Sequence, residues 1–292
     1  RDLLSKILVG LGAKVISLGR TDVFVPIDTE AVSQADIDQA KQWSAEIGFD
    51  AILSTDGDAD RPLIGDEFGQ WFRGDIVGIL CAQFLGAQAV VIPVSCNTAI
   101  ELSRAFPHIA RTRIGSPYVI AGMSEMIASG KLNVVGFEAN GGFLLGSLIN
   151  KNGKRLLPLM TRDAVLPMLA ILALAKDKDC ALSQLLNDLP ARYTGSDRLQ
   201  SFPVEESRRI LEALSVSTEA ISALLVSTGG HAMNIDLTDG LRIYLDNGEI
   251  VHFRPSGNAP ELRCYAEAAS QERANWLASE CLQLIRDFSQ NK

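Results

Sequence analysis

Residues 50–62 read DAILSTDGDADRP, an apolar run that leads directly into three aspartates on alternate positions. The run has the length and composition of a short strand, so Asp56, Asp58 and Asp60 are expected just beyond its carboxyl end. Ligand sites of open α/β sheets gather at that edge. Because three carboxylates this close together repel one another, a cation is expected between them. The stretch therefore predicts an α/β fold with a binding site at the end of one strand.

The residues of this acidic loop favour a hard cation bound next to a phosphate. Alternating carboxylate oxygens in a tight loop suit Mg²⁺ or Ca²⁺. Gly57 would let the backbone turn sharply enough to aim all three carboxylates inward. Arg61 adds a guanidinium beside them, and this group is suited to pairing with a phosphate.

Two other interpretations of the loop remain open. An EF-hand loop also carries acids at alternate positions and a glutamate at its twelfth position, where Glu67 falls when Asp56 is counted as the first. Arg61 then occupies the sixth position, where the EF-hand turn requires glycine. The segment before the loop is also a predicted strand, whereas a helix precedes the loop of an EF-hand. The other alternative is a solvated acidic turn, which the apolar run before the loop disfavours.

Outward from the loop, hydrophobic spacing predicts alternating helices and strands in the first two thirds of the chain. We expect helices over residues 3–11, 35–47, 74–85, 118–129 and 161–176, and strands over residues 13–19, 50–55, 89–94 and, around a glycine-rich turn, within 132–149. Such alternation predicts α/β domains with mixed or parallel sheets.

The last third of the chain changes character. Asp-Gly and Asn-Gly pairs between apolar segments of residues 231–268 predict several antiparallel strands, and residues 272–288 predict an amphipathic helix. A polar stretch over residues 191–205 predicts a linker. We therefore expect two successive α/β domains and a C-terminal α+β domain with an antiparallel sheet, over residues 1–105, 106–194 and 195–292.

Composition limits the class of protein. The formal net charge of -8 argues against a nucleic-acid partner and against anionic membranes. No apolar run is long enough to span a bilayer. The five cysteines are scattered and form no CxxC pair, which predicts free thiols in a reducing compartment, and hence a cytoplasmic protein.

The first residues raise an expectation about the chain itself. The chain starts at Arg1, and a helix that feeds a strand is usually the second half of a βαβ unit. We therefore expect a preceding strand that is absent here, and a chain that is a fragment of a longer protein.

A second candidate site lies in GFEANGGFLLG, residues 136–146. Glu138 ends an apolar run, and Asn140 follows it. A carboxylate next to an amide can accept from and donate to neighbouring sugar hydroxyls, and the glycines allow a close approach. Asn-Gly is equally common as a plain hairpin turn, so both interpretations stay open.

A third candidate site lies in RPSGNAPELRCY, residues 254–265. The Arg254 guanidinium, the Ser256 hydroxyl and the backbone N–H groups around Gly257 and Asn258 would suit a phosphate dianion. Pro-Ser-Gly is also ordinary turn chemistry, so a solvated turn is the alternative.

In this order, TDGDADR, GFEANGG and RPSGNAPELRCYAEA resemble the α-D-phosphohexomutases, which include the phosphomannomutases, phosphoglucomutases and phosphoglucosamine mutases. The resemblance covers nearly the whole chain. Members of this family have four domains around one cleft, and the three loops lie on the second, third and fourth domains. The family interconverts hexose 1-phosphates and 6-phosphates by moving phosphate between O1 and O6 through a hexose 1,6-bisphosphate.

The resemblance also implies roles for individual residues. Asp56, Asp58 and Asp60 would bind Mg²⁺, which neutralises a phosphoserine during phosphoryl transfer, and Arg61 would lie beside the reacting phosphate. Glu138 and Asn140 would read the sugar hydroxyls. The non-reacting phosphate of the substrate would be held by Arg254, Ser256, Gly257 and Asn258.

Two departures from the family pattern matter. The family carries its phosphoserine in a Ser-His-Asn-Pro segment of the first domain, and this chain has no such segment. Many members also read Glu-x-Ser-Gly-His in the sugar loop, where this chain has Asn140, Gly141 and Gly142, so the general acid or base is unassigned. Arg113 matches a basic position near the start of the third domain. We expect structural roles for the three histidines.

The sequence therefore predicts a phosphohexomutase fragment, close to the phosphomannomutase or phosphoglucomutase branch, that is inactive alone. Its partners would be a hexose phosphate and the missing N-terminal domain of the same protein. The alternative is a non-catalytic module that binds sugar phosphate and metal. An upstream Ser-His-Asn-Pro segment would distinguish them, because only the enzyme needs it. The sequence does not choose between mannose, glucose and glucosamine phosphates.

Overall fold

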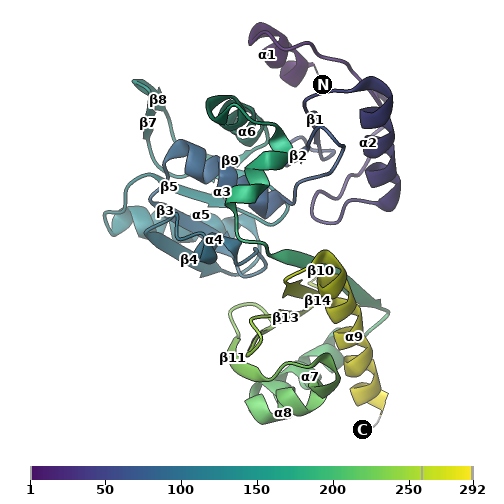
Figure 1. Ribbon diagram of the computed structural model, residues 1–292. Coiled ribbons are helices and arrows are strands. Elements are labelled where there is room, and N and C mark those ends of the chain that lie inside the picture. The colour runs from purple at the N-terminus through teal and green to yellow at the C-terminus, as the bar shows by residue number, and fades with distance from the viewer. Residues whose placement is uncertain (1, 258, 291–292) are drawn as a thin grey trace.

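The computed structural model describes residues 2–257 and 259–290 and divides them between two lobes (Figure 1). One lobe holds the N-terminal elements and a domain built on a mixed sheet. The other lobe is a C-terminal domain built on an antiparallel sheet, which the chain enters through β10. The expected fold class, mixed α/β structure followed by an antiparallel α+β domain, is confirmed.

The mixed-sheet domain has three layers around five strands in the order β4-β3-β5-β6-β9. β3 is parallel to β4 and β5, whereas β6 is antiparallel to β5 and β9. Its elements are α3 (Gly74–Leu85), β3 (Ala89–Pro93), α4 (Ala99–Leu102), β4 (His108–Thr112), α5 (Ser116–Ala128), β5 (Val134–Phe137), β6 (Phe143–Leu145), the hairpin of β7 (Ile149–Lys151) and β8 (Lys154–Leu156), β9 (Leu159–Asp163), α6 (Val165–Lys178) and the 3₁₀ helix η1 (Leu182–Asp188).

The central strands are continuous apolar runs because helices cover both faces of the sheet. Alternate side chains of one strand point to opposite faces. Accordingly, Val90 and Ile92 of β3 pack in the core cluster that contains Ile79 of α3, whereas Val91 packs in the cluster that contains Met123 of α5.

The domain boundaries expected from the sequence do not coincide with the sheets. The boundary between residues 105 and 106 would separate β3 from β4, which are hydrogen-bonded neighbours. The boundary after residue 194 lies two residues into β10, the strand through which the chain enters the C-terminal sheet. The discrepancy at residue 105 arises because the hydrogen bonds of a sheet join segments that are distant in the sequence.

The N-terminal part contributes two helices and one hairpin: α1 (Leu3–Gly10), α2 (Gln34–Ile47), β1 (Ile52–Thr55) and β2 (Pro62–Gly65). β1 pairs with β2 in antiparallel fashion, so this part has no parallel sheet among its described residues. Ser33 caps the start of α2, because its hydroxyl accepts the N–H of Asp36 at 3.1 Å. It packs against the turn at Gly69, where a Cβ would lie only 2.5 Å from the carbonyl oxygen of Ala40.

The prediction of a strand over residues 13–19 is wrong. This segment belongs to neither sheet nor hairpin in the described part of the chain. Ile16 and Leu18 are 48% and 38% exposed. A short apolar run needs a neighbouring strand to take up its backbone hydrogen bonds, and no strand of residues 2–257 and 259–290 lies beside this one.

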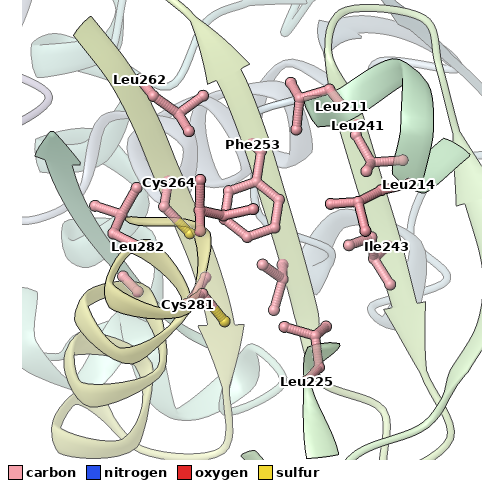
Figure 2. Close-up of a cluster of buried hydrophobic side chains, with 14 of the residues drawn as sticks. Leu211, Leu214, Leu225, Leu241, Ile243, Phe253, Leu262, Cys264, Cys281 and Leu282 are labelled. Carbon is pink, nitrogen blue, oxygen red and sulfur yellow. The ribbon is translucent and has the colours of Figure 1, made fainter. Parts of the chain in front are cut away.

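The C-terminal domain is a five-stranded antiparallel sheet of order β10-β14-β13-β12-β11 with helices on one face. Figure 2 shows Phe253 and Cys264 of the sheet beside Cys281 and Leu282 of α9. Its elements are β10 (Tyr193–Gln200), α7 (Val204–Ser215), α8 (Thr218–Leu224), the 3₁₀ helix η2 (Val226–Thr228), β11 (Ala232–Asp236), β12 (Leu241–Leu245), β13 (Ile250–Pro255), β14 (Glu261–Ala268) and α9 (Gln271–Gln290).

Two further expectations are corrected by strand pairing. Residues 193–200, expected within a linker, form the edge strand β10, because an edge strand exposed on one side tolerates a polar sequence. The helix expected from residue 161 starts at Val165, since residues 159–163 form β9 beside β6. This second correction places Arg162 on a strand.

The cysteines are free thiols, as expected. Cys81, Cys96, Cys264 and Cys281 are buried, and Cys180 is half-buried. Burial raises the pKa of the Cys81 thiol well above its ordinary value, so this thiol stays protonated. No helix in residues 2–257 and 259–290 is long and apolar enough to cross a membrane.

Candidate active site

The acidic loop connects β1 to β2 and closes on itself. The buried carboxylate of Asp56 accepts the backbone N–H groups of Asp60 and Arg61, each at 3.2 Å. The sharp bend comes from Ala59, whose φ of 61° lies in the left-handed region. Gly57, which the sequence suggested as the turn residue, does not have a positive φ and instead packs closely against Phe24. A Cβ there would lie 2.2 Å from the ring of Phe24.

Arginines neutralise part of this acidic loop. Arg61 Nε lies 3.6 Å from Asp56 Oδ2 and 3.8 Å from Asp60 Oδ1. Arg162 Nη1 donates to Asp60 Oδ2 at 3.1 Å. Burial raises the pKa of Asp56, although the backbone N–H of Arg61 acts in the opposite direction. The structure therefore brings Asp56 and Asp60 together around guanidinium groups, while Asp58 stays exposed.

The donor set of this loop fits a hard cation. Asp60 Oδ1 is buried and has no hydrogen-bond partner, so it has an unused lone pair beside Asp56. Carboxylate oxygens are the ligands that Mg²⁺ prefers. However, no three His, Cys, Asp or Glu side chains of the described residues already stand in a metal-binding arrangement. Mg²⁺ would require Asp58 to turn inward.

We expect Asp58→Asn to weaken Mg²⁺ binding by about tenfold, because it removes one negative charge from the ligand set. Calorimetric titration of Mg²⁺ into the wild-type and variant chains measures the effect. Asp177→Asn, on the exposed end of α6, is the matched control and should bind as the wild type does. Equal affinities in all three chains would contradict the assignment.

The glycine-rich loop between β5 and β6 lies directly against the acidic loop. A Cβ on Gly141 would come within 3.1 Å of the carbonyl oxygen of Pro62. The Glu138 side chain is buried, and the amide oxygen of Asn140 accepts the N–H of Gly142 at 3.0 Å. The two loops that the sequence singled out separately thus share one surface.

Arg162 of β9 links these two loops, although it was not among the site residues expected from the sequence. Its Nη2 and Nε both lie 2.7 Å from Glu138 Oε2, while its Nη1 contacts Asp60. No sequence signal marked it, since an arginine after an apolar run resembles any solvated residue. Only the pairing of β6 with β9 places it beside Glu138.

An N-terminal segment also reaches the two loops. The Thr29 hydroxyl donates to the carbonyl oxygen of Asn140 at 2.7 Å, and the Phe24 ring covers Gly57. These contacts were not expected, because nothing in the sequence connects this extended segment with either loop.

The third candidate loop, between β13 and β14, belongs to the other lobe. Arg254 Nε pairs with Asp239 Oδ2 at 3.2 Å. Ser256 is buried, and its N–H donates to the carbonyl of Glu261 at 2.8 Å. Gly257 is exposed, whereas Asn258 lies outside the described residues.

This loop borders a cavity of about 480 Å³ that it shares with the mixed-sheet domain. Arg113, Asp239, Ser256 and Gly257 line it. Asp239 also accepts the backbone N–H of Ile114 at 2.9 Å, which joins the two lobes at this point. The structure thus brings Arg113 next to the third loop.

A second contact fixes the orientation of the C-terminal domain. The buried Glu267 carboxylate pairs with Arg192 at 2.7 Å and accepts the N–H of Thr98 at 3.1 Å. Asn97 donates to the carbonyl of Arg192 at 2.9 Å. These bonds hold the lobe that carries Arg254 against the mixed-sheet domain.

His252 has surroundings that suit the structural role expected for it. Its ring is buried, and Nε2 lies 2.6 Å from the carbonyl oxygen of Asp239. Burial lowers its pKa to about 4, so the ring is neutral at pH 7. It therefore packs beneath Asp239 without adding charge.

Comparison with known proteins defines the class. Residues 73–193 match the family described as phosphoglucomutase/phosphomannomutase, alpha/beta/alpha domain III. Residues 198–284 match the C-terminal domain of the same family. Together with the loops described above, these matches show that the chain belongs to the α-D-phosphohexomutase family.

Within the family, the chain is similar to phosphomannomutases. It is 52% identical over 274 residues to the phosphomannomutase of Salmonella muenchen, covering 94% of this chain and 57% of that protein. It is 44% identical over 287 residues to the phosphomannomutase of Sinorhizobium fredii, covering 98% of this chain and 60% of that protein. The chain thus spans less than two thirds of the length of these relatives.

Solved structures share the fold. A phosphoglucomutase/phosphomannomutase family protein from Burkholderia thailandensis aligns with a TM-score of 0.59 at 19% identity, over 88% of this chain and 50% of that chain. The N-acetylphosphoglucosamine mutase of Aspergillus fumigatus, in complex with GlcNAc-6P and magnesium, aligns with a TM-score of 0.54 at 19% identity, over 81% of this chain and 48% of that chain.

Proposed function

We propose that this chain forms most of the substrate site of a phosphohexomutase that moves phosphate between O1 and O6 of a hexose through a 1,6-bisphosphate. The observation that carries the proposal is the contact between the acidic and glycine-rich loops, with Arg162 bonded to Asp60 and Glu138 at 2.7–3.1 Å. A metal-binding loop and a sugar-reading loop must lie this close if one hexose phosphate is to touch both. The family membership and the phosphomannomutase relatives support the same conclusion.

Each loop has a distinct task in this proposal. Asp56, Asp58 and Asp60 would hold Mg²⁺, which neutralises charge on the phosphoryl group while it is transferred. Arg61 lies next to these carboxylates and would pair with the oxygens of the same phosphate. Glu138 would accept from a sugar hydroxyl.

Asn140 is suited to donate to a sugar oxygen. Its amide oxygen already accepts the N–H of Gly142, which leaves the NH₂ group for the substrate. A bonded amide oxygen also fixes the plane of the amide, so the donor direction is set before the sugar arrives. A carboxylate at Glu138 and an oriented amide at Asn140 can together recognise two neighbouring hydroxyls.

The third loop would hold the phosphate that does not react. Arg254, Ser256, Gly257 and Asn258 supply a guanidinium, a hydroxyl and backbone N–H groups. Arg254 is paired with Asp239, so a dianionic phosphate would compete with this carboxylate for the guanidinium. Arg113 lines the same cavity and would add positive charge there.

The proposal extends to cofactor and partners. Hexose 1,6-bisphosphate would act as intermediate and activator, and the family's phosphoserine domain would be the protein partner. Large apolar side chains of the N-terminal part, including Leu3, Val9 and Leu11, are more than half exposed and could pack against such a domain. The excess of acidic residues argues against nucleic-acid or membrane binding. We place the protein in the cytoplasm on the basis of its unpaired cysteines.

Loss of the Arg254 guanidinium tests the proposal by binding. We expect Arg254→Ala to weaken the binding of glucose 6-phosphate by about 1.5–3 kcal/mol, because a charge-assisted hydrogen bond to the phosphate is lost. Titration calorimetry with glucose 6-phosphate and mannose 6-phosphate measures the change. Arg286→Ala on the exposed side of α9 removes the same charge away from the loop. If Arg254→Ala and Arg286→Ala both bind as the wild type, the loop is only a hairpin.

A further inference from the structure

The surroundings of Arg162 direct its side chain into the site. It lies on β9, the edge strand of the mixed sheet, and its side chain is 19% exposed. A Cβ on Gly142, just before β6, would lie 2.7 Å from Arg162 Cδ, so a larger residue there would displace the arginine side chain from its present path. The guanidinium therefore reaches the interior of the site instead of solvent.

The contacts of Arg162 are divided between the two loops. Two of its nitrogens, Nε and Nη2, lie 2.7 Å from the same oxygen of Glu138, and the third, Nη1, lies 3.1 Å from Asp60 Oδ2. Glu138 is only 3% exposed. A carboxylate buried to this extent needs a paired charge, and Arg162 provides it.

The charge state of Arg162 is secure. A guanidinium stays protonated in proteins, and the two carboxylates that Arg162 contacts, Glu138 and Asp60, both favour its charged form. Arg162 therefore acts as a fixed cation with planar geometry, which a lysine could not reproduce.

We propose that Arg162 is a positioning residue that orients Glu138 toward the sugar and occupies Asp60 until a metal ion takes its place. The proposal rests on the proposed function of the site, since it assumes a hexose phosphate at Glu138 and Mg²⁺ at Asp60. Arg162 itself touches neither the reacting atoms nor the metal.

This role predicts two effects of opposite sign. Arg162 and Mg²⁺ compete for Asp60, and like charges repel, so removing the guanidinium should tighten Mg²⁺ binding about threefold to tenfold. Without Arg162, Glu138 loses the group that fixes its rotamer, so hexose phosphate binding should weaken about tenfold. General damage to the fold would instead weaken the binding of both Mg²⁺ and the hexose phosphate.

The experiment compares Arg162→Gln with Arg155→Gln, which removes an equal charge from the exposed β7–β8 hairpin. Mg²⁺ is titrated into each chain by calorimetry. Glucose 6-phosphate is then titrated at saturating Mg²⁺. We expect Arg162→Gln to bind Mg²⁺ more tightly and glucose 6-phosphate more weakly than the wild type does. Arg155→Gln should bind both ligands with wild-type affinity.

Arg162→Lys covers the case in which the glutamine variant does not fold. An ammonium keeps the charge but lacks the planar fork that places two nitrogens on Glu138. Mg²⁺ affinity should therefore stay near the wild-type value, while the affinity for glucose 6-phosphate falls. The inference would be overturned if a folded Arg162→Gln chain bound both ligands more weakly than the wild type, or bound either of them with unchanged affinity. A wild-type chain that binds no glucose 6-phosphate would instead overturn the proposed function, and this inference with it.

Discussion

The purified 292-residue chain should show no mutase activity, even when Mg²⁺ and a hexose 1,6-bisphosphate are supplied. Phosphoryl transfer depends on a donor placed in line with the acceptor oxygen, because positioning provides most of the catalysis. The resemblance to phosphohexomutases assigns that donor to a phosphoserine in a Ser-His-Asn-Pro segment, and this sequence contains no such segment.

Serines near the site are poorly placed to substitute for the donor. Ser54 lies half-buried on β1, and its hydroxyl faces the carbonyl of Thr55 at 3.5 Å. Ser95 is 7% exposed and lines a small space with Arg242 and Glu267, under the contact between the lobes. Among the described residues, neither hydroxyl donates a hydrogen bond to a carboxylate or an imidazole that would activate it.

A coupled assay that converts mannose 1-phosphate or glucose 1-phosphate to the 6-phosphate checks this prediction. A full-length phosphomannomutase, run under identical conditions, serves as the positive control. Turnover by the isolated chain at about 1 s⁻¹ or faster, a rate ordinary for enzymes, would mean that a residue inside this sequence carries the phosphate. The proposed mechanism would then be wrong.

The largest effect on stability is expected for Phe253→Ala, at about 3–5 kcal/mol. Phe253 is fully buried between the C-terminal sheet and its helices (Figure 2). Its neighbours, among them Leu211 of α7 and Leu282 of α9, belong to different elements, so they cannot close the cavity without moving the helices.

Hydrogen exchange measures this loss for each domain separately. Amides of β12 to β14 in the Phe253→Ala chain should exchange faster than in the wild type, because they open through unfolding of the domain. Amides of β3 and β5, in the mixed-sheet domain, provide the internal reference. Val216→Ala is the matched control, because Val216 is 82% exposed and should change stability by less than about 0.5 kcal/mol. Equal protection of β13 in the Phe253→Ala and wild-type chains would contradict the expected packing.

The candidate loops could be found from sequence because their chemistry is local. Asp56, Asp58 and Asp60 follow one another in a single loop, and Glu138 and Asn140 do the same in another. A strand end, a turn and the residue types between them depend mainly on near neighbours. The same reasoning found the antiparallel C-terminal sheet through its Asp-Gly and Asn-Gly turns.

Errors arose where the outcome depended on distant partners. Residues 13–19 were expected to form a strand on hydrophobicity alone, whereas residues 193–200 were expected to form a linker on polarity alone. Among the residues that the structure describes, no strand lies beside the first segment, whereas the second pairs with β14 along its whole length. Gly57 was assigned to a turn, although Ala59 bends the loop and Gly57 makes room for Phe24.

The carboxylates, amides and guanidinium groups of the loops, and the class of fold that presents them, can be read from the amino-acid order. Which of these groups meet depends on how the strands pair. The pairing of β6 with β9 carries Arg162 across Gly142 to Glu138 and Asp60, and the bend at Ala59 turns Asp60 toward that arginine while Asp58 remains in solvent. Charge pairing and burial depend on distances through space, and these distances are fixed only after strands far apart in the sequence have joined.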